Sequence, residues 1–149
     1  GPVSVPLNGR LAMRASFLAS FVFVSIGASA ATAFAADEPP FAAEHPGAVA
    51  LSQEEGKWIY RKFPTSVRLY VSEEDEPGKS NCNRQCAFAW PPLLVERENA
   101  QAMGQWTIII REDGRQQWAY KDQPVYMRFH DSPAEPSGTQ HEGWSFLEP

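Results

Sequence analysis

The chain has 149 residues, with 13 Lys and Arg against 18 Asp and Glu and a formal net charge of −5. An acidic chain without a cluster of basic residues argues against binding to nucleic acid or to an anionic membrane surface. The length fits one domain that buries a hydrophobic core without the help of many disulfides.

Residues 13–35 have the pattern of a secretory signal peptide. Arg10 and Arg14 precede an apolar run over 17–26, and the segment ends in Ala-Phe-Ala, which fits the small-x-small cleavage pattern. The run is shorter than the roughly 20 residues of a membrane-spanning helix, so no stable span is expected after cleavage. An uncleaved membrane anchor is the alternative interpretation.

Export predicts a periplasmic or secreted protein, whose thiols meet an oxidising environment. Residues 1–12 are interpreted as an upstream segment with no part in the fold. Residues 36–55 are rich in Ala and Pro and are expected to form a linker or arm. The folded domain is therefore predicted over residues 56–149.

Beyond residue 56 the apolar signal is short and β-like, with aromatic and β-branched runs between turn residues. Strands are expected over 57–63, 67–71, 106–111, 116–120, 125–129 and 143–147. The run 106–111 is nearly all apolar, which predicts burial on both faces. Gly114 suits a hairpin turn that needs a positive φ. Residues 82–89 are the best candidate for a short helix, ended by Pro91.

A weak internal repeat joins two parts of this region. In each, a hydrophobic residue precedes a tyrosine, and an aspartate follows five residues later, as in Tyr70 and Asp75 and again in Tyr126 and Asp131. We expect both rings to be buried and each aspartate to cap a turn by accepting backbone N–H bonds. The predicted fold is mainly β, with two degenerate β-meander repeats of six to seven short strands and one short, disulfide-bridged helical turn.

With these pieces assembled, the chain resembles a secreted repeat family of predicted bacterial lipoproteins that carry a Tyr-x4-Asp motif. The matching segments are LYVSEED, PGKSNCNRQCAFAWPPL, GQWTIIIREDGRQQWAYKDQPVYMRFHD and a final Gly-Trp, over about residues 56–146. The resemblance implies an exported protein with two such repeats, and it assigns no activity.

The chain departs from the family pattern in two ways. Ser72 and Arg128 stand where the family often has an aromatic residue, and no lipid-accepting cysteine is present at the cleavage point. The second departure favours a periplasmic form without a lipid.

Cys82 and Cys86 are the only cysteines, and their spacing leaves three interpretations of the pair open. In an exported protein an even cysteine count favours a structural disulfide. A thiol-redox role is the second reading, although thioredoxin-type sites use Cys-x-x-Cys. The third is a copper site, since thiolate and thioether ligands suit Cu(I), with His130 and Met127 as further ligands. On a strand those two residues would point to opposite faces.

No hydrolase motif or phosphate-binding loop is present. Trp90, in a stiff Trp-Pro-Pro element, is a candidate for an indole presented at the surface for binding. We therefore expect an exported cell-envelope binding or structural module without catalytic activity and without a cofactor. Its partner would be an envelope protein or a small ligand. A copper-binding or thiol-redox accessory protein is the alternative.

Overall fold

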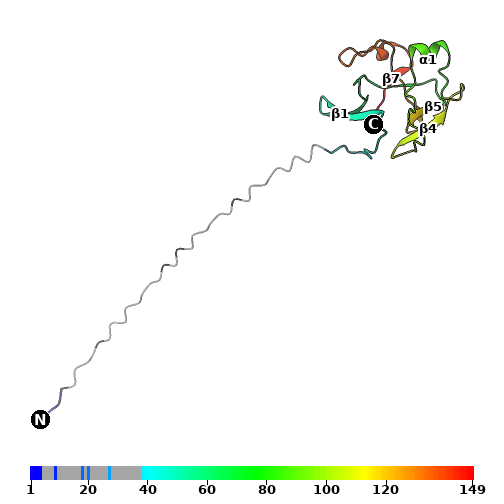
Figure 1. Cartoon of the computed structure of the whole chain (residues 1–149). Coiled ribbons are helices and arrows are strands. Elements are labelled where there is room, and N and C mark those ends of the chain that lie inside the picture. Colours follow the sequence, from blue (N-terminus) through cyan, green and yellow to red (C-terminus); the bar gives the residue numbers. More distant parts are fainter. Residues whose placement is uncertain (5–8, 10–17, 19, 21–26, 28–37) are drawn as a thin grey trace. The chain divides into compact units, whose positions relative to one another are not determined.

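The computed structural model describes residues 1–4, 9, 18, 20, 27 and 38–149 (Figure 1). The expected signal peptide and its cleavage point lie almost entirely outside these residues. The chain divides into two units, Gly1–Phe34 and Ala35–Pro149, and the second contains all the elements described below. In the described part of the chain, no helix has the length and apolar character needed to cross a membrane.

The second unit is mainly β, as predicted, with one short helical turn that carries a disulfide. The strands are β1 (Val49–Glu54), β2 (Lys57–Lys62), β3 (Tyr70–Ser72), β4 (Trp106–Ile110), β5 (Gln116–Tyr120), β6 (Gln123–Pro124) and β7 (Trp144–Phe146). The helices are α1 (Gln85–Ala89) and the 3-10 helix η2 (Gly138–Gln140).

The strands form three small antiparallel sheets. β1 pairs with β2, β3 pairs with β7, and β4, β5 and β6 form a meander in that order. Single bridges extend the β3–β7 pair, because Tyr126 is bridged to Tyr70 on one side and to Pro92 on the other. The middle of the unit is thus built from segments that are far apart in the sequence.

The predicted linker 36–55 contains β1, so the expectation that the folded domain begins near residue 56 was wrong. Val49 and Leu51 alternate with smaller or polar residues, and Val49 is 1% exposed. Six residue pairs join β1 to β2, around a turn in which Gly56 has a φ of 78°. The Ala/Pro-rich composition of this segment gave no indication of β1, which pairs with β2, the next strand in the chain.

Three strand predictions differ from the structure in detail, and one of them is the strand expected over 67–71, which begins only at Tyr70 and ends at Ser72. The segment 125–129 forms no strand beyond the single bridges of Tyr126, because β6 ends at Pro124 and the chain then lies between two different neighbours. β4 is not fully buried on both faces: Thr107 and Ile108 are only partly buried, and Ile110 at its end is 63% exposed. The hairpin prediction is confirmed, with Gly114 at a φ of 87°.

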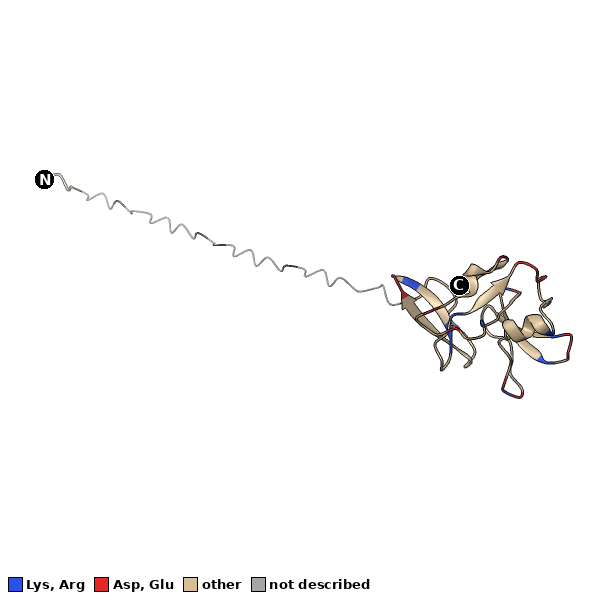
Figure 2. Ribbon diagram, turned by 90° about the horizontal axis from the view of Figure 1, so that it is seen from above, with Lys and Arg blue, Asp and Glu red and all other residues tan. Residues whose placement is uncertain are grey.

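Aromatic rings form the core in two clusters. The larger contains the mutually contacting rings of Tyr60, Trp106 and Tyr120, whose centroids lie 5.0–5.4 Å apart. The second contains Tyr70, Trp90 and Tyr126 beside the disulfide; its remaining members are Cys82, Cys86, Ala89, Trp144 and Phe146. Acidic and basic residues lie interspersed along the loops and strand ends around these clusters (Figure 2).

Candidate functional site

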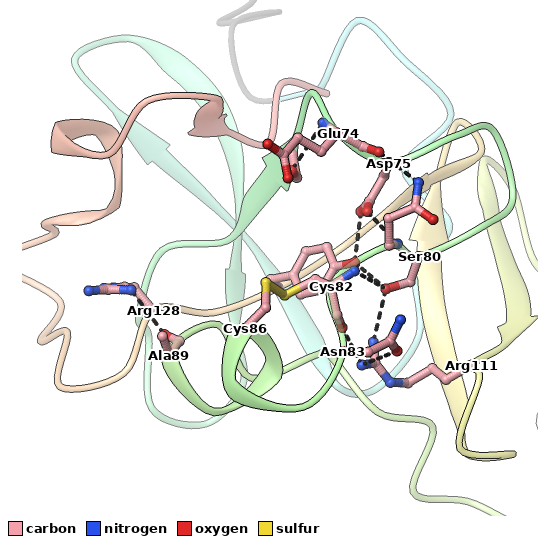
Figure 3. Close-up of a disulfide and its surroundings, with 12 residues drawn as sticks. Glu74, Asp75, Ser80, Cys82, Asn83, Cys86, Ala89, Arg111 and Arg128 are labelled. Carbon is pink, nitrogen blue, oxygen red and sulfur yellow. Dashed lines mark hydrogen bonds between the residues drawn. A yellow bond between two sulfur atoms is a disulfide. The ribbon is translucent and has the colours of Figure 1, made fainter.

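The cysteine pair forms a disulfide at the start of α1, with the two Cα atoms 5.1 Å apart (Figure 3). Cys82 precedes the helix, which begins only at Gln85. Between the cysteines, Arg84 has a φ of 57°, a left-handed conformation that breaks the helical path. The predicted helix 82–89 is therefore too long at its start. Because only Cys86 is helical, the wide Cβ spacing of a regular helix does not oppose the bond.

A buried arginine binds the backbone beside this disulfide. Arg111 follows β4 and is 3% exposed. Its Nη2 donates to the carbonyl oxygen of Cys82 at 2.6 Å, and its Nη1 donates to Gln117 Oε1 at 2.7 Å and to Ser80 Oγ at 3.2 Å. Arg111 makes none of the ion pairs found among the described residues, and its buried Nε has no hydrogen-bond partner.

A chain of hydroxyl groups joins this guanidinium to a carboxylate. Tyr126 donates its hydroxyl proton to Asp75 Oδ2 at 2.7 Å, and Ser80 Oγ lies 2.5 Å from the same hydroxyl. Since Tyr126 has a single hydroxyl proton, Ser80 is the donor in the second bond. The positive charge of Arg111 is thus linked to Asp75 through Ser80 and Tyr126, and Figure 3 shows Arg111, Ser80 and Asp75 in this arrangement.

The two Tyr-x4-Asp motifs exchange partners. Tyr70 donates to Asp131 Oδ2 at 2.5 Å across 61 residues, while Tyr126 donates to Asp75 across 51 residues. The backbones of the two tyrosines also bond each other twice, at 2.8 and 2.9 Å. Both rings are 0% exposed, as predicted. The hydroxyl of each motif therefore binds the carboxylate of the other motif.

Each aspartate also closes a turn in its own segment, as expected. Asp75 Oδ1 accepts the N–H of Asn81 at 2.7 Å. Asp131 Oδ1 accepts the N–H and the hydroxyl of Ser137, at 3.0 and 2.6 Å. In each aspartate, one carboxylate oxygen thus accepts a backbone N–H of a local turn, and the other accepts the hydroxyl of a distant tyrosine.

Two tryptophans stack between the tyrosines. The rings of Trp90 and Trp144 lie 3.7 Å apart and nearly parallel. Trp90 meets the edge of Tyr70 at 5.4 Å, and Trp144 meets that of Tyr126 at 5.1 Å. Trp90 is only 5% exposed, so the expectation of an indole presented at the surface was wrong. The guanidinium of Arg128 covers its ring, 4.6 Å from the centroid.

Burial shifts the proton affinities in this cluster. Burial is the largest cause that raises the pKa of Tyr70 to about 12, and the hydrogen bond to Asp131 adds to it. Burial likewise raises the pKa of Tyr126. Burial also raises the pKa of Asp75, against the hydrogen bonds from Asn81 and Tyr126, which lower it. The phenols are therefore neutral hydrogen-bond donors at all ordinary pH values.

The residues named for the copper alternative are not assembled. Both sulfur atoms are in the disulfide, His130 is exposed and Met127 is partly buried in the larger cluster. Within the described residues, no group of three or more His, Cys, Asp or Glu side chains is placed to hold a metal ion.

A cleft of about 700 Å³ opens on another part of the unit. Its apolar surface comes from four segments and includes Ala48, Phe63, Val95, Met103 and Trp118. Phe63 is 56% exposed at the rim, whereas Trp118 is 3% exposed. The charged lining residues are Lys62, Glu96, Arg97 and Glu98. The loop 96–99 showed no binding signal in the sequence, because only the fold brings it opposite residues 62–64.

Arg111 and Ser80 were also missed from the sequence. An arginine directly before a Glu-Asp-Gly turn looks like an ordinary exposed turn residue, and its burial depends on the disulfide loop packed over it. No protein-family model, curated protein or solved structure matches this chain.

Proposed function

We propose that the chain is an exported, non-enzymatic binding module of the cell envelope that holds a small, largely apolar ligand in the cleft. The cleft is the observation that carries this proposal. Its volume lies within the roughly 300–1,000 Å³ of ligand pockets, and its wall combines a somewhat larger apolar part with polar and charged groups. Charges of both signs at the rim favour a ligand with an apolar body and a polar end.

Two degenerate repeats are part of the proposal. The exchanged Tyr–Asp bonds, the reciprocal Tyr70–Tyr126 backbone pair and the Trp90–Trp144 stack support it, because in each of these three contacts the two segments contribute equivalent residues. In this proposal the paired segments have a structural role, and the cleft binds the ligand.

Ligand binding is tested with N-phenyl-1-naphthylamine, a neutral apolar probe whose fluorescence rises in apolar surroundings. We expect saturable binding by the protein and at least about a tenfold weaker affinity for Phe63→Ala, roughly the 1.4 kcal/mol expected from lost apolar contact. Phe88→Ala is the matched control, because Phe88 is 70% exposed and lies outside the cleft. Equal weakening by both variants, or no saturable binding, would refute the cleft as the binding site.

Export is tested separately by expressing the tagged full chain in a bacterium and fractionating the cells. We expect the tagged protein outside the cytoplasm, with a new N-terminus at Ala36. Recovery of the uncleaved chain from the cytoplasm would contradict the localisation without bearing on the cleft.

A further inference from the structure

The two sulfur atoms of the disulfide lie in different surroundings. Cys82 is 3% exposed, and its N–H and carbonyl groups are bonded to Ser80 and Arg111. Cys86 lies on the first turn of α1 and is partly exposed. A thiolate that approaches from solvent therefore meets Cys86 first.

A buried guanidinium binds the backbone of Cys82 on the inner side of the disulfide. The guanidinium of Arg111 bonds the Cys82 carbonyl oxygen at 2.6 Å. No carboxylate of the described residues lies within ion-pair distance of this guanidinium, and its buried Nε has no partner. This contact places a cation on the backbone of the residue at which the thiolate would be released, and nearby cations stabilise thiolates.

We propose that the Cys82–Cys86 disulfide exchanges with thiols, with Cys86 as the sulfur that is attacked and Cys82 as the sulfur that leaves. An external thiolate attacks Cys86 Sγ, forms a mixed disulfide there and breaks the Sγ–Sγ bond, whose electron pair remains on Cys82 Sγ. A second external thiolate attacks the external sulfur of that mixed disulfide and releases Cys86 as a thiolate. Two thiolates are oxidised to one disulfide, and the protein disulfide is reduced to two thiolates.

Two opposing effects decide which sulfur leaves. Burial in an apolar cluster disfavours a thiolate at Cys82, whereas an adjacent buried cation favours it. Arg111 forms no direct ion pair among the described residues, and its charge also acts on Asp75 and Asp113, so we expect the cation to offset part of the burial. Arg111 is a positioning residue in this scheme, because it acts on the leaving sulfur and not on the attacking thiol.

The local nature of the bond makes exchange compatible with a stable fold. The disulfide closes a loop of sequence separation 4, so the chain-entropy model places its stabilisation near the low end of the usual range for disulfides. The exchanged Tyr–Asp bonds and the ring contacts of the aromatic clusters are noncovalent and do not include the bond between the two sulfur atoms. Reduction is thus expected to leave the unit folded.

The direct test uses the unmodified protein and glutathione as the thiol. The folded protein is treated with millimolar reduced glutathione, quenched with acid, digested and mapped by mass spectrometry. We expect a glutathione adduct on Cys86 in at least about tenfold excess over Cys82, with unchanged far-ultraviolet circular dichroism. An adduct mainly on Cys82, or a disulfide that glutathione opens only in denaturant, would overturn the proposal.

Single-cysteine variants provide a second measurement that does not need the disulfide. In Cys82→Ser the free Cys86 should react with iodoacetamide at least about tenfold faster than the free Cys82 does in Cys86→Ser. The role of Arg111 is read from thiolate absorbance at 240 nm in the reduced protein. Arg111→Gln should shift the onset of that absorbance to higher pH, and Arg111→Lys should restore part of the shift. An unchanged profile in Arg111→Gln would assign Arg111 a structural role only and remove it from the scheme.

Discussion

In this fold the tyrosine of each Tyr-x4-Asp motif binds the aspartate of the other motif. Mutations should therefore be coupled between the two motifs and not within one motif. Tyr70→Phe removes a buried hydroxyl that donates to Asp131 and accepts the N–H of Gly138 at 3.2 Å. A hydrogen bond to a charged group contributes about 1.5–3 kcal/mol. We therefore expect Tyr70→Phe to lower the free energy of unfolding by about 2 kcal/mol.

The decisive quantity is the coupling energy in double-mutant cycles. Tyr70→Phe removes the donor of this bond and Asp131→Asn removes the charge of its acceptor, so their coupling should be about 1–2 kcal/mol. Tyr70→Phe and Asp75→Asn share no hydrogen bond, although they lie in one motif, so their effects should add within about 0.5 kcal/mol.

Urea unfolding followed by tryptophan fluorescence measures all the variants, with the slope against urea used to check two-state behaviour. The reasoning would be refuted if the coupling were larger within a motif than between the two motifs.

The remaining predictions concern the core, a close contact, pH and metal. Trp118→Ala should lower the free energy of unfolding by about 3–5 kcal/mol in urea unfolding, because Trp118 is 3% exposed; an unchanged free energy of unfolding would contradict this. A Cβ at Gly138 would meet the Tyr70 ring, so Gly138→Ala should cost about 1–3 kcal/mol in the same assay, and a stabilised variant would be the wrong outcome. Burial raises the pKa of Tyr70 and of Tyr120 to about 12 in the fold from 10.0. Because the neutral phenols are favoured in the fold, their contribution to the free energy of unfolding is complete below pH 10. It is lost as pH rises from 10 to 12, by at most about 1.4 kcal/mol per pH unit for each tyrosine. Thermal unfolding followed by circular dichroism from pH 9 to 12 should show a falling melting temperature, and a constant melting temperature would contradict this. The reduced protein, titrated with Cu(I) against a competing chelator, should bind no more tightly than a variant with both cysteines as serine, and clearly tighter binding would revive the copper alternative.

Local sequence patterns predicted much of the β structure because those elements depend on near neighbours. The aromatic and β-branched runs over 57–63, 106–111 and 116–120 became β2, β4 and β5 within a residue. The hairpin at Gly114 followed from one glycine. The pattern failed at β1, where only its pairing with β2 distinguishes a strand from an Ala/Pro-rich arm.

The candidate sites were less predictable, because they depend on segments that meet only in the fold. Phe63 and Met103 belong to different loops, and nothing in either loop indicates a shared cleft. Arg111 is a charged residue beside a turn, and only the disulfide loop packed over it makes it a buried cation. Burial and partners of this kind are properties of the tertiary contacts.

By itself, the sequence determined the β class, the cysteine pair and the two burial-prone tyrosines, since local propensity, residue chemistry and periodicity carry that information. Only the tertiary structure decided that Tyr70 binds Asp131 and that Tyr126 binds Asp75. It also placed Trp90 against Trp144 in the interior. These choices rest on contacts across 51 to 61 residues, over which the spacing of residues in the chain says nothing about their distance in space.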